Sequence, residues 1–280
     1  MPELPELQAH AERLDARYAG TRLAQFRPIT FTALKTAVPA PADAYGQPLA
    51  FVGRRGKHLL LDFGVLTFVV HLMQGGRLKE EPVDKQPAKP RGGQARWVFD
   101  DGRALLLTEA GTERRAGVWA VGGDPETQPP LAGLGPDADN VDPDTMLELL
   151  HAHPMRLHGF LRDQHVIAGI GRRLANEVCH RAKLSPFAST GKMAKEDAAA
   201  IVEAIGACIN ESLAYDRSRD DMSSSADRPG SVHHRVGEPC PLCGDTIRSV
   251  EYAKYTVAYC PTCQTGGKVL ADNTTSKFLK

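Results

Sequence analysis

The stretch from Cys240 to Cys263 reads CPLCGDTIRSVEYAKYTVAYCPTC and carries four cysteines as two CxxC pairs. Cys240 and Cys243 form the first pair, Cys260 and Cys263 form the second, and sixteen residues separate the pairs. This spacing is typical of zinc ribbons, in which four thiolates bind one tetrahedral ion. Residues 247–259, between the pairs, have the β-branched and aromatic composition of strands. The sequence therefore predicts a β-hairpin that zinc holds together.

Two disulfides or a redox-active dithiol are alternative uses of these four cysteines. The amino terminus lacks the basic and hydrophobic regions of a signal peptide, so we expect a cytosolic protein, in which disulfides are rare. Zinc is thus favoured, and one structural ion is expected because four thiolates leave no open coordination position. Two further cysteines, Cys179 and Cys208, lie within helical patterns and are expected to pack in the core.

The charge of the chain is balanced in total but unevenly distributed. The 280 residues, enough for about two domains, include 34 basic and 34 acidic side chains. Residues 124–153 contain seven acidic and no basic side chains, whereas residues 154–183 contain six basic and two acidic ones. This basic segment is compatible with nucleic acid, and a solvated helix face is the alternative. No apolar run approaches the length of a membrane span, so no membrane partner is expected.

The chain opens with MPELPEL, which has two interpretations. Prolines and acidic residues are favoured in the first turn of a helix, and an apolar stripe at helical spacing follows them. If Met1 is removed, however, Pro2 presents a free secondary amine that titrates near neutral pH. Such an amine can attack the C1′ atom of a sugar and form an iminium, with Glu3 beside it.

Strand patterns fill the first half of the chain and helical patterns fill the second. The predicted strands, which indicate an antiparallel sandwich or barrel, are 57–63, 65–72, 95–100, 103–109 and 114–121. The predicted helices are 143–151, 154–163, 170–183 and 195–215. Residues 122–143 have the Pro, Gly and Asp content of an interdomain linker.

Six segments, in this order, resemble the formamidopyrimidine-DNA glycosylase and endonuclease VIII family of repair enzymes over nearly the full length. They are PELPE at the start, GRRGKHLLLDF (53–63), RRAGVW (114–119), GIGRRLANEVCHRAKLSP (169–186), GEPCPLCG (237–244) and YCPTCQTGGK (259–268). The resemblance implies an α+β multidomain fold. Its expected parts are an N-terminal helix with an antiparallel catalytic β-sandwich (1–123), an interdomain linker (124–142), a helix-two-turn-helix DNA-binding domain (143–231) and a C-terminal zinc β-hairpin (232–280).

The resemblance also implies a base-excision glycosylase with an associated abasic-site lyase that acts by β- and δ-elimination. Pro2 is then the Schiff-base nucleophile and Glu3 the proton donor and acceptor, while Glu6 supports the start of the first helix. Lys57 is implied to bind phosphate, although an isolated Gly-Lys pair is more often a surface turn. The implied partner is damaged double-stranded DNA. A monomeric bacterial-type protein of the cytoplasm, associated with the nucleoid when acting, is expected.

Several positions depart from the family pattern. Arg172 stands where the family has a phosphate-binding asparagine, and it either keeps that contact or is a surface arginine. Gln74 stands at the place of the wedge methionine, as in the endonuclease VIII branch, which favours oxidised pyrimidines over 8-oxoguanine. Arg115 remains as the candidate for reading the orphaned base, but Ala116 replaces the intercalating phenylalanine.

In the hairpin, Tyr255 replaces the phosphate-binding arginine of the family, and Lys254 is the neighbouring candidate for that charge. Neighbours on a strand point to opposite faces, which weakens this substitution. Together these departures leave a second hypothesis, a DNA-binding protein that keeps the scaffold without base excision. A zinc-ribbon module that binds another protein is a third, but it leaves the start of the chain unexplained.

Four histidines precede the basic helical motif. His151, His153, His158 and His165 could be read as a metal cluster. They lack paired ligand spacing on one helix face, so their pattern favours helix surface.

Overall fold

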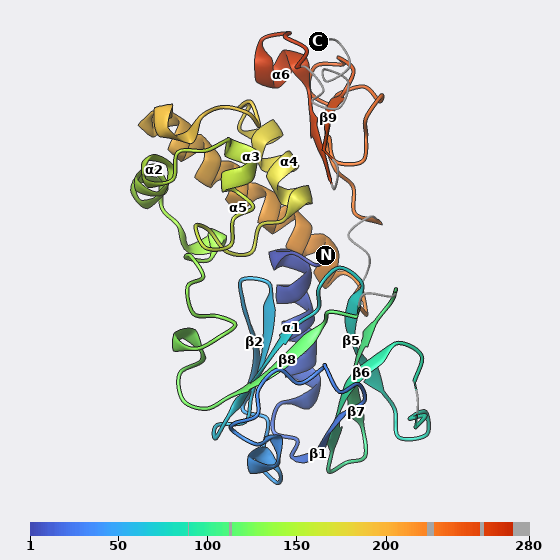
Figure 1. Cartoon of the computed structure of the whole chain (residues 1–280). Coiled ribbons are helices and arrows are strands. Elements are labelled where there is room, and N and C mark those ends of the chain that lie inside the picture. Colours follow the sequence, from blue (N-terminus) through green and yellow to red (C-terminus); the bar gives the residue numbers. More distant parts are fainter. Residues whose placement is uncertain (89, 112–113, 223–226, 253–254, 271–280) are drawn as a thin grey trace. The chain divides into compact units, whose positions relative to one another are not determined.

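The computed structural model describes residues 1–88, 90–111, 114–222, 227–252 and 255–270. The chain forms two compact units (Figure 1). The first comprises residues 1–133 with 216–223, and the second comprises residues 134–215 with 224–280. The domain limits drawn from the sequence stay a prediction.

The first unit contains two four-stranded antiparallel sheets. In sheet order, the first consists of β1 (Leu23–Pro28), β6 (Gly93–Phe99), β7 (Ala104–Glu109) and β5 (Gly76–Glu81). The second consists of β2 (Phe51–Arg55), β3 (His58–Asp62), β4 (Thr67–His71) and β8 (Gly117–Val121). Phe68 and Trp97 pack edge to face across the sheets, 5.7 Å between ring centroids. The predicted β-sandwich is confirmed.

The helix α1 (Leu4–Tyr18) packs into the same core. Its predicted apolar stripe is buried throughout and consists of Leu4, Leu7, Ala11, Leu14 and Tyr18. Two short 3-10 helices, η1 (Pro41–Ala44) and η2 (Pro125–Thr127), complete this unit.

Three strands escaped the sequence analysis, namely β1, β2 and β5. All three lie at sheet edges. An edge strand has an unpaired side and tolerates charged residues, as the sequence GRLKEE of β5 illustrates. Its polar pattern therefore hid a strand from a search for apolar runs.

The second unit is helical and ends in the cysteine-rich hairpin. Its helices are η3 (Ala138–Asn140), α2 (Pro143–Ala152), α3 (Leu157–Phe160), α4 (Arg172–Arg181), η4 (Thr190–Lys192) and α5 (Lys195–Arg217). The hairpin consists of β9 (Arg248–Tyr252), β10 (Tyr255–Tyr259) and the following helix α6 (Pro261–Thr265). Each of the four predicted helices has a counterpart, although the one expected at 154–163 is the single turn α3. Cys179 and Cys208 are buried, as predicted.

The helix α5 is long and apolar enough to cross a membrane, by length and composition alone. The sequence analysis expected no such segment. Ile201, Ile205 and Ile209 of this helix are buried in the protein, which is the behaviour of a core helix. The apolar composition of α5 is thus explained by its packing within the fold.

Candidate functional site

The amino terminus of α1 holds two buried carboxylates. Glu3 is the N-cap residue, and its side chain accepts a hydrogen bond from the backbone of Glu6. The Glu6 Oε2 atom in turn accepts the backbone N–H of Glu3 at 3.0 Å, which completes a capping box. Only 5% of Glu3 and 2% of Glu6 is exposed. The PELPE motif therefore does start a helix, and it also buries two acidic groups beside the first residues of the chain.

Charged groups surround the amino-terminal amine. Burial lowers the pKa of the Met1 amine, and smaller contributions come from Glu3 and Glu6, which raise it, and from Arg77 and Lys57, which lower it. A lowered pKa increases the fraction of unprotonated, nucleophilic amine near neutral pH. The predicted residues Glu3, Glu6 and Lys57 thus act on the same end of the chain.

Lys57 occupies the two-residue turn between β2 and β3, where Arg55 pairs with His58. The turn needs a glycine first, because Gly56 has φ +52°. Lys57 is only 6% exposed. It is therefore not the surface lysine that a Gly-Lys pair suggests on its own.

Strand register brings the other predicted residues of this unit to the same end of the sheet. One row crosses the sheet β2-β3-β4-β8 through the paired residues Arg55, His58, His71 and Gly117. Lys57 comes directly before His58, and Arg115 lies two residues before Gly117. The loop that carries Gln74 begins directly after His71, where β4 ends. The backbone N–H of Ala110 donates to the carbonyl of Gly75 at 3.2 Å, which joins the last two loops.

The loop with Gln74 at its exposed tip has a fixed backbone. Met73 has φ +53°, and its N–H donates to His71 Nδ1 at 3.2 Å. Burial, followed by the charge of Lys57, lowers the pKa of His71 to about 4, so its imidazole is neutral and can accept this bond at neutral pH. A Cβ atom at Gly76 would lie 2.0 Å from the Leu72 carbonyl oxygen, so this position requires glycine. Nothing in the local sequence pattern around His71 shows this contact, so His71 was not among the predicted site residues.

Arg115 is exposed next to a buried alanine. Ala116 is fully buried in the hydrophobic core of the first unit, and its N–H donates to Glu109 Oε2 at 2.7 Å. The side chain at position 116 therefore faces inward and does not project beside Arg115. A phenylalanine there would overfill the core unless the loop were rearranged.

The four cysteines of the second unit converge. Their Sγ atoms all lie within 4.8 Å of one another, with 3.8 Å between Cys240 and Cys263 and 3.4 Å between Cys243 and Cys260. Thiolates around a tetrahedral zinc ion, at Zn–S distances of about 2.3 Å, are separated by about 3.8 Å. The donor set thus fits one structural zinc ion, as the sequence predicted.

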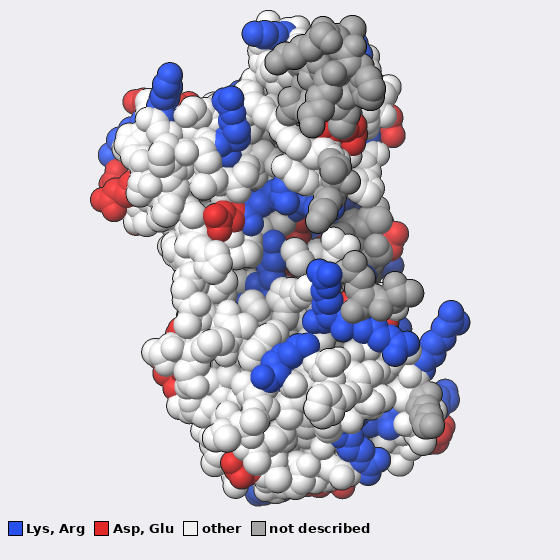
Figure 2. Space-filling view, viewed as in Figure 1, with Lys and Arg blue, Asp and Glu red and all other residues white. Residues whose placement is uncertain are grey.

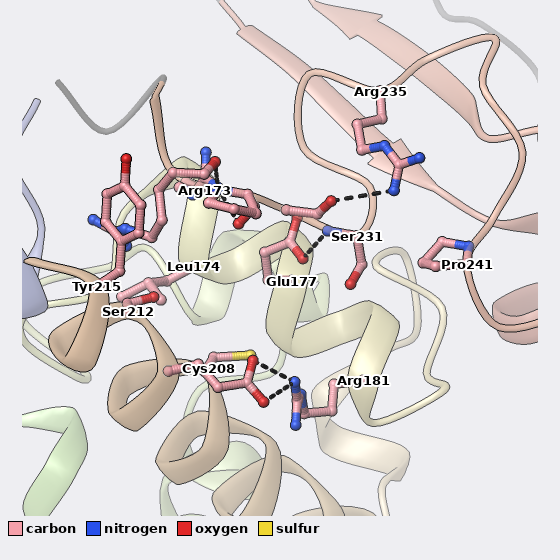
Figure 3. Close-up of a pocket in the computed structure, with 14 residues that line it drawn as sticks. Arg173, Leu174, Glu177, Arg181, Cys208, Ser212, Tyr215, Ser231, Arg235 and Pro241 are labelled. Carbon is pink, nitrogen blue, oxygen red and sulfur yellow. Dashed lines mark hydrogen bonds and ion pairs between the residues drawn. The ribbon is translucent and has the colours of Figure 1, made fainter.

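The helix α4 anchors the segment that leads into the hairpin (Figure 3). Arg173 donates to the carbonyls of Arg228 and Pro229, the latter at 2.7 Å. Glu177 accepts backbone N–H groups from each of three consecutive residues, Ser231, Val232 and His233, and Figure 3 draws the bond from Ser231. Arg173, Glu177 and Ser231 line a cavity of about 380 Å³. Both side chains hold the segment in place, so the basic residue Arg173 has a structural role.

The zinc site also contacts α4 directly. His180 Nε2 lies 3.2 Å from Cys240 Sγ, and Gln264 Nε2 donates to the carbonyl of Leu184 at 3.0 Å. His180 itself is buried. The metal centre therefore packs on the helix that presents Arg172 at its first turn.

Arg172 follows Gly171, the N-cap residue of α4. Its guanidinium carbon lies 5.8 Å from the centroid of the Tyr255 ring. The structure thus brings together two positions at which the sequence departs from the family pattern. Lys254, the alternative candidate, lies outside the described residues.

The histidine segment is mostly exposed, as expected, with one exception. His151 and His165 are exposed and His153 is half-buried, but His158 is only 3% exposed. Its ring stacks on Tyr255 at 6.1 Å. The surface assignment was wrong for His158, because α3 turns this face toward the hairpin. Among the described residues, the cysteines are the only group of three or more Cys, His, Asp or Glu side chains placed to hold a metal ion.

Fold and site together define a zinc-ribbon protein with a helix-capped β-sandwich and buried carboxylates at its amino terminus. Residues 1–119 match the formamidopyrimidine-DNA glycosylase N-terminal domain, residues 132–224 its H2TH domain, and residues 237–266 the zinc finger found in Fpg and IleRS. The formamidopyrimidine-DNA glycosylase of Thiobacillus denitrificans is 32% identical over 279 residues, which cover 94% of this chain and 100% of that protein. A formamidopyrimidine-DNA glycosylase-like protein of Mycobacterium tuberculosis is 42% identical over 154 residues, which cover 54% of this chain and 98% of that protein.

Solved structures of Fpg proteins share the fold of this chain. The MutM (Fpg) protein of Thermus thermophilus superposes with a TM-score of 0.80 at 28% identity, covering 96% of this chain and all of that one. A Lactococcus lactis Fpg complex shares the fold, with a TM-score of 0.84 at 21% identity, over 94% of this chain and all of that one. The chain belongs to the formamidopyrimidine-DNA glycosylase (Fpg) family, whose members are DNA glycosylases with abasic-site lyase activity.

Proposed function

We propose that this protein removes oxidised bases from double-stranded DNA and then cleaves the strand at the abasic site. The observation that carries the proposal is the group around the amino terminus, where buried Glu3, Glu6 and Lys57 act on one amine. Removal of Met1 takes that amine away and exposes the secondary amine of Pro2, the residue next to Glu3. A secondary amine in this setting is suited to covalent catalysis on a sugar.

The proposed reaction starts with attack of the Pro2 nitrogen on C1′ of an extruded nucleotide. The bond between C1′ and the base breaks, and the base leaves with the bonding electron pair. The attached Pro2 nitrogen loses its N–H proton to Glu3, and Glu3 passes a proton to the ring oxygen as the C1′–O4′ bond breaks, which leaves an iminium between Pro2 and C1′. The iminium acidifies the C2′ proton, and its loss expels the 3′-phosphate in β-elimination, followed by δ-elimination of the 5′-phosphate. Lys57 binds a phosphate beside the lesion.

Several features support damaged DNA as the partner. Figure 2 shows Lys and Arg side chains on the visible face of the first unit, which suits a polyanion despite the neutral total charge. The Lactococcus lactis Fpg that shares this fold was solved with DNA containing an oxidised pyrimidine. We expect Gln74 to fill the gap left by the extruded nucleotide and Arg115 to contact the orphaned base. We further propose that the protein is a monomer of the bacterial cytoplasm that acts at the nucleoid and binds no membrane.

A panel of duplexes, each with one oxidised base, tests the proposed function. We expect base release and strand cleavage on denaturing gels, with oxidised pyrimidines processed faster than 8-oxoguanine because of Gln74. An undamaged duplex is the control. Tight binding to the panel without base release or cleavage would instead support a protein that kept the scaffold for DNA recognition alone.

A further inference from the structure

Two arginines and two aromatic rings surround the ring of Tyr255 in the second unit. The Tyr255 ring stacks on Tyr252 at 4.7 Å, with 11° between the ring planes, and on His158 at 6.1 Å. The guanidinium carbon of Arg162 lies 4.2 Å from the Tyr255 centroid, and that of Arg172 lies 5.8 Å from it. Both distances are within the range of about 6 Å for cation–π attraction. Three separate elements, the end of α3, the start of α4 and the hairpin, therefore contribute to one cluster.

The other arginines of residues 154–183 are used within the fold. Arg156 donates to the carbonyl of Phe187 at 2.7 Å, and Arg181 forms an ion pair with Glu211. Arg173 holds the segment before the hairpin, as described above. The protein thus employs these groups for its own structure.

Arg162 and Arg172 differ from these neighbours. Within the described parts of the chain, neither guanidinium group forms an ion pair with a carboxylate or a side-chain hydrogen bond. Burial, followed by the charge of Arg162, lowers the pKa of His158 to about 3, so the histidine adds no third positive charge at neutral pH. Two half-exposed cations therefore share one tyrosine ring, and no carboxylate among the described residues forms an ion pair with either of them.

A phosphodiester group is an anion that suits the guanidinium groups of Arg162 and Arg172. A guanidinium group presents a rigid fork of N–H donors to phosphate oxygens, and it stacks on aromatic rings at the same time. Two guanidinium groups repel each other, so a ring that attracts both restricts where they stand before an anion binds. Such preorganisation reduces the entropy lost on binding.

We propose that Tyr255 is a positioning residue whose ring holds Arg162 and Arg172 as a pair that binds one phosphate of the DNA backbone. The proposal rests on the proposed function, because it takes DNA as the partner. It assigns a role to Arg162, which the sequence analysis did not single out. It also accounts for the tyrosine at position 255, because the hairpin then contributes a ring and the helical region contributes the charges.

The salt dependence of DNA binding tests this proposal, because each phosphate contact that is lost reduces the slope of log K against log salt by about 1. Fluorescence anisotropy with a duplex that contains one abasic-site analogue gives this slope. We expect Arg162→Ala and Arg172→Ala each to reduce the slope by about 1. We expect Tyr255→Ala to reduce it by up to about 1 although it removes no charge, because one phosphate contact is lost, and Tyr255→Phe to keep it, because the ring is retained. The double variant Tyr255→Ala/Arg162→Ala should lose less binding free energy than the two single variants lose in sum, because both substitutions remove the same phosphate contact.

Arg156→Ala is the matched control, since it removes a nearby charge that does not contact Tyr255, and its slope should equal that of the unmodified protein. Arg162→Lys provides a second test should Tyr255→Ala fail to fold. It keeps the charge but loses the planar group that stacks on the Tyr255 ring. The slope of log K against log salt should be reduced in this variant. A wild-type slope for Tyr255→Ala or Arg162→Lys would overturn the proposal while leaving the proposed function intact. Absence of DNA binding by the unmodified protein would overturn both.

Discussion

Replacing Glu3 by glutamine is expected to slow base release by about 100- to 10,000-fold, the range that positioned acid–base groups supply. The glutamine side chain has nearly the same shape, and its carbonyl oxygen can still accept the N–H of Glu6 that completes the capping box. It cannot, however, donate a proton to the sugar and take it back as a carboxyl group does. The loss should therefore appear in the rate and not in the stability of the protein. Single-turnover release of the base from a lesion duplex gives the rate, and thermal unfolding gives the stability.

Glu80→Gln is the matched control for this experiment. Glu80 is an exposed carboxylate of the same unit that forms an ion pair with Arg17, and the mechanism does not use it. Its replacement should leave the rate within a factor of two or so of the unmodified protein, since surface ion pairs contribute little. If Glu3→Gln and Glu80→Gln behaved alike, Glu3 would not be the proton donor.

Removing zinc is expected to reduce DNA affinity at least 100-fold while the β-sandwich stays folded. The buried apolar cluster of the hairpin is small and includes two of the metal ligands, Cys240 and Cys260. Metal binding therefore supplies much of the folding free energy of this part. The core of the first unit includes none of the described hairpin residues, so it should survive chelation.

The chain provides its own reporter for this comparison. Both tryptophans, Trp97 and Trp119, lie in strands of the first unit, so their fluorescence reports on the sandwich alone. Anisotropy with labelled duplex DNA measures affinity before chelation, after metal loss verified by elemental analysis, and after zinc is restored. Full affinity in verified metal-free protein would refute the role assigned to the hairpin.

The parts of the fold that were predictable are those in which local pattern and tertiary role coincide. The cysteine spacing specified the zinc hairpin because four thiolates at this separation have few other uses in a cytosolic protein. The stripe from Leu4 to Tyr18 specified α1, because the face that repeats at helical spacing is the buried one. Strands in the middle of the sheets were found for the same reason, whereas the polar edge strands were not.

The parts that sequence could not provide depend on contacts between distant segments. Nothing in the pattern around His158 shows that it is buried against Tyr255, since that contact joins residues almost 100 positions apart. The inward orientation of Ala116 is likewise set by the core and by Glu109. One usable signal was missed, because Tyr252 and Tyr255 flank the centre of a predicted hairpin and pair directly in its register.

The central claim is that the amino-terminal amine forms a covalent iminium with DNA, and borohydride trapping tests it most directly. The protein, with loss of Met1 confirmed by intact mass, is incubated with a duplex that carries one abasic site in the presence of borohydride. The same chain with an uncleaved N-terminal extension, which blocks the amine, is the control. The account predicts a covalent protein–DNA adduct that peptide mapping places on Pro2 and that the blocked chain does not form. No adduct from Met1-free protein that still binds the duplex, or an adduct that maps to Lys57, would contradict it.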